Sequence, residues 1–156
     1  MNANIGISES NSKAVALELN KLLANEFVLY TKTRSSHWNI ESPSFMELHK
    51  LFEGQYEELD EIVDSVAERV RSIGHYSEGR LVDFLKLTDL LEEGYSDNQK
   101  TLITNLVNDH ETIIRQLRRL IDEFANKYND AGSSDFVTSL IGKHEKTAWM
   151  LRSYLK

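Results

Sequence analysis

Apolar residues recur every three or four positions along most of this chain, which is the spacing of one buried helix face. The pattern predicts a first helix over residues 12–38 and, after a break at Ser42-Pro43, a second over 45–73. A short helical segment at 81–87 lies in the long connection to a third helix, which ends near residue 127. A fourth helix covers residues 134–155, and no segment reads as β-rich. The chain is therefore predicted to be all-α.

Local signals support these boundaries. Pro43 suits a helical restart, because proline is favoured in a first turn, and Gly74 suits the position just after a helix end. Ser96-Asp97-Asn98-Gln99 has the form of a capping box. The expected apolar surface of the first helix comprises Val15, Leu17, Leu19, Leu22, Leu23, Phe27 and Leu29. Two helical pairs with a crossover describe a ferritin-like four-helix bundle over residues 12–156, preceded by a short tail at 1–11.

Composition narrows the possible functions. With no cysteine, the chain cannot use disulfides, thiol catalysis, or cysteine-ligated zinc or iron–sulfur centres. No segment approaches the roughly 20 apolar residues that span a bilayer. No signal peptide is visible, so a cytoplasmic location is expected. The net charge of −7 argues against a generally nucleic-acid-binding surface and is compatible with attracting cations.

The candidate chemistry lies in two imidazoles and three carboxylates: His37, His49, Glu53, Asp64 and Glu68. Nitrogen and oxygen ligands of these kinds bind iron. If residues 45–73 form one helix, His49 and Asp64 lie about 22 Å apart along its axis, at about 1.5 Å per residue. A metal–ligand bond is only about 2 Å long. One chain cannot bring both residues to one ion, so the sequence suggests an oligomer with its chemistry at a subunit interface.

The second helix carries its acidic residues on one face. His49, Glu53, Asp60, Asp64 and Glu68 fall within about one 100° sector, which we call the acidic seam. The neighbouring sector holds an apolar stripe consisting of Leu48, Phe52, Leu59, Ile62, Val63, Val66 and Val70. The alternative interpretation of the acidic seam is a solvated charged face, as most acidic runs are. The two histidines favour metal binding.

The spacing of these residues resembles one family in particular. No glutamate is followed by histidine three residues later, which counts against a ferritin or bacterioferritin with its centre inside one bundle. His37-Trp38-Asn39, then His49 twelve residues on, then Asp64-x-x-x-Glu68 instead resembles the Dps family of mini-ferritins. The resemblance covers essentially the whole chain, and residues 48–74 look like the second helix of that family throughout.

The resemblance to Dps implies a ferroxidase enzyme. It implies a hollow shell of twelve subunits, in which His37, His49 and Glu53 of one subunit meet Asp64 and Glu68 of a two-fold partner. Iron would be oxidised there from Fe²⁺ to Fe³⁺, with hydrogen peroxide as the preferred oxidant, and stored inside as ferric mineral. Such a reaction would protect against oxidative damage. Many members carry aspartate where Glu53 stands, and glutamate remains a hard oxygen ligand suited to iron.

DNA binding is the alternative function that the family name implies, with ferroxidase activity then secondary. Some members bind DNA through lysine- and arginine-rich tails. Here the first twelve residues contain no Lys or Arg, and no basic extension follows the fourth predicted helix. Because non-specific affinity grows with the number of phosphates neutralised, weak or absent DNA binding is expected. Arg115, Arg118 and Arg119 cluster on the third helix, where a solvated or interface role is the simpler account.

Some further polar residues carry open alternatives. Asp130 and Asp135 occur where the acidic three-fold pore of the family usually lies, and a ring of them would draw Fe²⁺ inward. Turn and helix-cap roles are equally compatible with these two positions. His75, His110 and His144 lack a ligand-like constellation. We expect each of these three to be a surface or hydrogen-bonded histidine.

Overall fold

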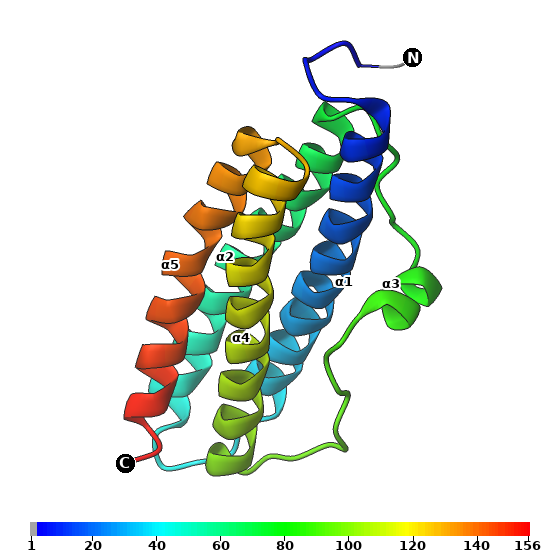
Figure 1. Cartoon of the computed structure of the whole chain (residues 1–156). Helices are drawn as coiled ribbons and strands as arrows, with labels where there is room; N and C mark the ends of the chain where they lie inside the picture. Colours follow the sequence, from blue (N-terminus) through cyan, green and yellow to red (C-terminus); the bar gives the residue numbers. More distant parts are fainter. Residues whose placement is uncertain (1–2) are drawn as a thin grey trace.

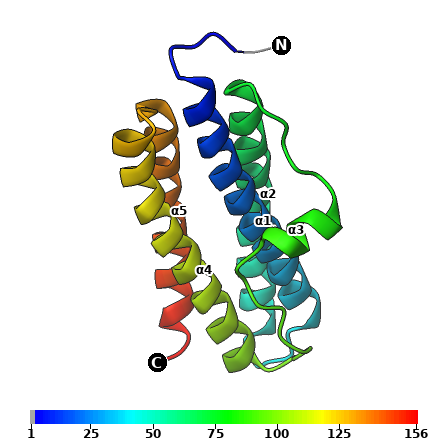
Figure 2. The ribbon, with the colours of Figure 1, turned by 45° about the vertical axis from the view of Figure 1, so that its right-hand side comes forward.

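The computed structural model describes residues 3–156, and four long helices lie side by side in it as one bundle (Figure 1). The elements in chain order are α1 Glu9–Asn39, α2 Phe45–Ser72, α3 Leu81–Leu87, α4 Gln99–Asp122, the π-helical η1 Glu123–Lys127 and α5 Ala131–Ser153. Antiparallel pairs are formed by α1 with α2 and by α4 with α5, and the link bearing α3 runs outside α1 (Figure 2). Within residues 3–156, no helix is long and apolar enough to cross a membrane. The predicted all-α, ferritin-like bundle with a short extra helix is confirmed.

The core is built largely from the apolar stripes that the sequence predicts. On α2 the fully buried members are Leu48, Phe52, Leu59, Ile62, Val66 and Val70. Gln55 is also buried in this stripe, and sequence reasoning did not find it. The expectation for Leu17 is wrong, since this side chain is 57 % exposed. Leu17 is two residues from both Val15 and Leu19, which turns it about 200° around the helix, away from the core.

The C-terminal end of α2 follows the sequence prediction. Gly74 has a φ of +93°, a left-handed conformation that glycine adopts without the steric cost of a Cβ. Its N–H donates to the backbone oxygen of Arg71 at 3.0 Å, and the N–H of His75 donates to that of Val70 at 3.2 Å. These two bonds satisfy carbonyls that the helix would otherwise leave unpaired.

Three helix beginnings differ from the prediction. Helix α5 begins at Ala131, three residues earlier than expected, with Asp130 as its side-chain cap. The capping box at Ser96 is wrong, because the N-cap of α4 is Asn98, whose side chain accepts from the N–H of Thr101 at 3.1 Å. The hydroxyl of Ser96 instead accepts from the N–H of Asn98. Helix α1 begins at Glu9, three residues earlier than expected, with Ser8 as a side-chain cap. A capping side chain within reach of a free N–H decides such boundaries, and several neighbouring residues here compete for that role.

The side chain of Asn25 connects the long segment between α2 and α4 to the bundle through hydrogen bonds. Its side chain is fully buried and makes three hydrogen bonds. Nδ2 donates to Oε1 of Gln116 on α4 at 2.8 Å. Oδ1 accepts from the hydroxyl of Thr88 and from the N–H of Asp89, each at 2.8 Å. One side chain thereby joins α1, α4 and the segment that follows α3.

Candidate metal centre

His37 and His49 face each other where the end of α1 meets the beginning of α2. Their rings stack with centroids 3.7 Å apart and planes inclined by 20°. Nδ1 of His37 lies 2.8 Å from the backbone oxygen of His49, and Nδ1 of His49 lies 3.0 Å from the backbone oxygen of His37. We call these two side chains the imidazole pair. The two helices hold it in one arrangement.

The reciprocal contacts decide which ring nitrogen carries the proton. A carbonyl oxygen only accepts, so each Nδ1 must donate. Each neutral imidazole then has its lone pair on Nε2, and a metal ion binds to this atom. A hydrogen bond from the other ring nitrogen to a carbonyl is the usual way in which proteins orient a ligating histidine. The fold therefore prepares both rings as ligands.

Glu53 follows His49 by about one turn on α2. Its Oε2 accepts a hydrogen bond from Nζ of Lys50 at 2.5 Å, and its side chain is partly exposed. This hydrogen bond, together with the charge of Lys50, lowers the pKa of Glu53. The carboxylate is thus held ionised near two imidazoles. A metal ion bound there would compete with Lys50 for one carboxylate oxygen.

Asp64 and Glu68 are exposed farther along the same helix. Because α2 is continuous, Asp64 lies about 22 Å from His49 along the axis. In the part of the chain from residue 3 onward, no group of three or more His, Cys, Asp or Glu side chains is arranged to hold a metal ion. One chain therefore presents the predicted ligands as two separate parts: the imidazole pair with Glu53, and two exposed carboxylates.

Two neighbours of the imidazole pair were missed by sequence reasoning. The ring of Tyr56 meets that of His37 edge-on, with centroids 5.3 Å apart. The guanidinium of Arg34 lies 4.5 Å from the Tyr56 ring centroid and 5.5 Å from that of Trp38. Tyr56 comes seven residues after His49, two turns along the same helix face, and this spacing is the signal that could have identified it.

The structure separates the roles of the two aspartates considered for a pore. Asp130 is buried at the start of α5, where Oδ1 accepts from the N–H of Ser133 at 2.9 Å. The same oxygen pairs with Arg69 at 3.3 Å. Asp130 is therefore a helix cap with its charge compensated inside the chain. Asp135 is exposed, so it is the member of the two that is available to a pore.

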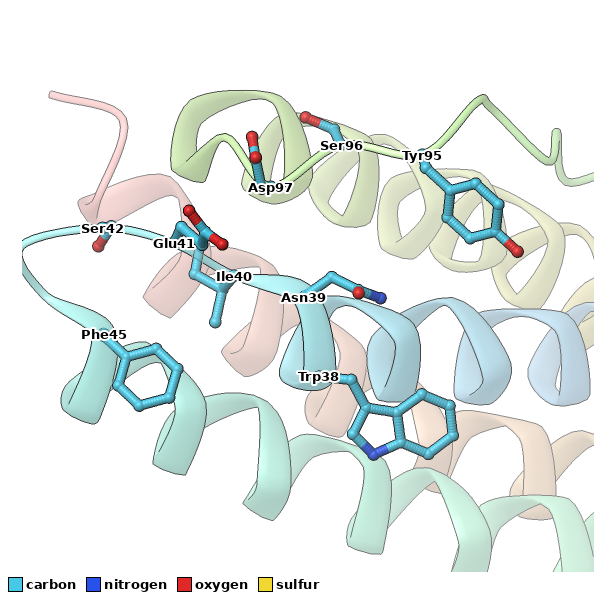
Figure 3. Close-up of a pocket in the computed structure, with 9 residues that line it drawn as sticks. All are labelled: Trp38, Asn39, Ile40, Glu41, Ser42, Phe45, Tyr95, Ser96 and Asp97. Carbon is cyan, nitrogen blue, oxygen red and sulfur yellow. The ribbon is translucent and has the colours of Figure 1, made fainter.

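A pocket of about 850 Å³ opens at the end of the bundle near the imidazole pair (Figure 3). Trp38 and Phe45 lie on its α1 and α2 side, and Tyr95 lies on the segment leading into α4. The N–H of Glu41 donates to the backbone oxygen of Asp97 at 3.0 Å and ties these two sides together. No imidazole lines the pocket, so it is distinct from the predicted ligand set.

The basic cluster on α4 is largely neutralised by carboxylates. Arg118 pairs with Glu145 at 2.5 Å, and Arg119 pairs with Glu18 at 2.8 Å. Arg115 donates to a threonine hydroxyl one turn away. Arginines that are engaged with carboxylates are less available to phosphates. This arrangement agrees with the expected solvated role.

The sequence and the fold of this chain are similar to those of several known proteins. The sequence matches the ferritin-like domain family over residues 16–156. An uncharacterized low temperature-induced protein of Nostoc sp. is 41 % identical, over 98 % of this chain and 86 % of the relative. DNA protection during starvation protein 2 of Bacillus anthracis is 31 % identical, over 92 % of this chain and 98 % of the relative. The crystal structure of the Dps protein from Vibrio cholerae O1 gives a TM-score of 0.93 at 33 % identity, covering 100 % and 98 % of the two chains.

The fold and the extended match make this chain a member of the ferritin-like family. Its similarity to DNA protection during starvation proteins and to solved Dps structures places it, within that family, among the Dps proteins. The Vibrio cholerae protein is itself described as one of the ferritin-like diiron-carboxylate proteins. Family membership supports an iron-storage role of the mini-ferritin kind.

Proposed function

We propose that this protein oxidises Fe²⁺ to Fe³⁺ at sites shared by two copies of the chain. The imidazole pair carries this proposal, because reciprocal bonds from both Nδ1 atoms leave both Nε2 lone pairs for a metal ion. The ionised carboxylate of Glu53 adds an oxygen donor beside them. Imidazole and carboxylate ligands accommodate both oxidation states of iron. Iron is here the substrate as well as the stored cargo.

A two-fold-related copy supplies the missing ligands in this proposal. Asp64 and Glu68 of one chain approach His37, His49 and Glu53 of the other, so that each pair of chains forms two identical sites. The exposure of both carboxylates on α2 is compatible with such a contact. Twelve copies then enclose a hollow shell in which ferric mineral accumulates, as the resemblance to Dps implies.

Hydrogen peroxide is the proposed oxidant. Each ferrous ion releases one electron, while one peroxide molecule takes two electrons and two protons to give water. Carboxylates in the completed site stabilise the higher charge of Fe³⁺. Removing iron and peroxide in the same reaction limits hydroxyl-radical formation, which is the protective role that we assign to the protein.

A pair of matched variants on the acidic seam tests the proposal. Asp64 and Asp60 are both exposed on α2, one turn apart, but only Asp64 is a proposed ligand. We expect Asp64→Asn to lose most peroxide-driven oxidation after anaerobic Fe²⁺ loading, and Asp60→Asn to retain it. The assay follows ferric absorbance after adding peroxide or oxygen. Equal rates in the two variants would show that Asp64 does not bind the reacting iron.

A further inference from the structure

A chain of polar side chains crosses the core of the bundle, away from the imidazole pair. Glu26 of α1, His144 of α5 and His110 of α4 are at most 2 % exposed. Oε1 of Glu26 lies 2.9 Å from Nε2 of His144, and Nδ1 of His144 lies 2.9 Å from Nδ1 of His110. We call these three residues the buried triad. Glu26 is eleven residues from His37 on α1, about 16 Å along the axis.

Gln55 extends this polar region from the remaining long helix. Its side chain is buried in the apolar stripe of α2. Two contacts set the helix registers: His37 stacks on His49 between α1 and α2, and Lys32 pairs with Asp109 between α1 and α4. Both helix pairs are antiparallel, so residues can be counted from each contact at the same rise along the two helices. This counting places Gln55 and His110 at the same level along the bundle axis. Each of the four long helices thus contributes a buried polar residue to this region.

The hydrogen bonds within the buried triad constrain where its protons lie. The carboxylate of Glu26 accepts, so Nε2 of His144 donates to it. Nδ1 of His144 and Nδ1 of His110 are 2.9 Å apart, so one of these two nitrogens donates to the other. If each ring carries one proton, Nδ1–H of His110 donates to Nδ1 of His144. That assignment leaves Nε2 of His110 without a proton.

Several atoms of this region are buried without a hydrogen-bond partner. They are Oε2 of Glu26, Nε2 of His110, and both Oε1 and Nε2 of Gln55. Among residues 3–156, the Glu26 carboxylate is hydrogen-bonded to His144 and to no lysine or arginine. Unsatisfied buried polar atoms are uncommon in native proteins and call for an explanation such as an ion or a water molecule. A buried carboxyl group with one unpaired oxygen, next to an imidazole, offers oxygen and nitrogen atoms of the kinds that bind a cation.

We propose that the buried triad binds one divalent transition-metal ion between the carboxylate of Glu26 and Nε2 of His144. The present separation of these atoms, 2.9 Å, is close to the roughly 3.3 Å between two ligands that each lie about 2.0–2.1 Å from one tetrahedral ion. Both carboxylate oxygens can serve, which uses the unpaired Oε2. Two residues thereby provide three donor atoms for the ion.

The remaining residues of the region then form the support of this site. When the metal takes Nε2 of His144, the proton of that ring sits on Nδ1 and is donated to Nδ1 of His110. His110 in turn carries its proton on Nε2, and Gln55 lies at the same level along the bundle axis. With one proton on each ring before and after metal binding, no proton is released. A ligating histidine that donates its other N–H is the normal support in metal sites.

Zinc serves as the probe, in a background that lacks the interface ligands. The full-length variant His37→Ala/Asp64→Ala is loaded with Zn²⁺, desalted, and analysed for zinc per chain by mass spectrometry. We expect one retained ion per chain, and the loss of most of this zinc when Glu26→Gln is added. Adding His75→Gln instead, at a histidine bonded to Ser12 outside the triad, is expected to change nothing. Equal retention with and without Glu26→Gln would overturn the proposal.

A second measurement needs no substitution in the core. Crystals of the unmutated protein are soaked with Zn²⁺, and anomalous scattering at the zinc edge locates every bound ion. The proposal requires a peak between Glu26 and His144. Zinc peaks confined to the interface and the outer surface would refute it, even if a core variant had failed to fold.

Discussion

Mixing two inactive variants gives the most direct test of the shared ferroxidase site. His37→Ala removes one imidazole from every site, and Asp64→Ala removes one carboxylate. We expect each variant alone to oxidise little iron and still to assemble, because the buried stripe of α2 carries the packing. In His37→Ala, His49 keeps its own hydrogen bond, since the acceptor is the backbone oxygen of residue 37.

The structure determines how much ferroxidase activity should return in the mixture. Asp64 lies about 22 Å from His49 along one helix, so a site that uses both draws on two chains. When equal amounts pair at random, half of the two-fold pairs are mixed. A mixed pair contains one site lacking both groups and one site that is intact. About one quarter of all sites is therefore intact, and about one quarter of the wild-type activity should return.

A matched mixture separates the shared site from a site within one chain. The double variant His37→Ala/Asp64→Ala is mixed with equal wild-type protein. Shared sites predict about one quarter activity in this mixture as well, whereas sites within one chain predict about one half here and none in the first mixture. Native mass spectrometry verifies mixing, and ferric absorbance after peroxide addition gives the rate. Verified mixed shells of the two single variants without recovered activity would refute the interface arrangement.

Three further predictions concern assembly, DNA and pH. Native mass spectrometry should show a dodecamer, and a stable monomer or a 24-subunit shell would contradict the proposed assembly. Duplex DNA should give no gel shift at near-neutral pH and moderate salt, because Arg118 and Arg119 of α4 are paired with carboxylates. A tight complex that is weakened steeply by added salt would reveal a basic surface that we missed. Burial raises the pKa of Asp109 from 3.8 to about 6 despite its ion pair with Lys32. Between pH 3.8 and about pH 6 the native state therefore binds more protons than the unfolded state. The native state loses stability as pH rises through this range. Asp109→Asn should remove this pH-dependent loss of stability, which is at most about 3 kcal/mol. The test compares the Tm of the variant with that of the wild type at pH 4 and at pH 7. A difference in Tm that is the same at both pH values would contradict the prediction.

Much of the fold could be predicted from the sequence because helix periodicity is a local property. The spacing of apolar residues on α2 predicted which side chains are buried, and Gly74 marked its end. Leu17 shows the limit of such reasoning. It is apolar and helical, yet only its angle relative to the packed face decides that it is exposed.

The candidate metal centre was predictable in part for a similar reason. Helix rise alone shows that His49 and Asp64 cannot share an ion within one chain, whatever the packing. The tautomer of the imidazole pair was not predictable, because it depends on backbone oxygens brought together by the turn between α1 and α2. Tyr56 and Arg34 were missed because their relation to His37 is a matter of side-chain direction.

By itself, the sequence determined the helices, their apolar faces and the separation of ligands along α2. Only the tertiary structure decided which polar residues meet inside the bundle. His110 and His144 were expected to be surface or hydrogen-bonded histidines, and the structure shows them hydrogen-bonded in the core. Their partners are 34 and 118 residues away along the chain, on different helices. No local spacing encodes such contacts, because they arise only when the helices pack and exclude water from the groups between them.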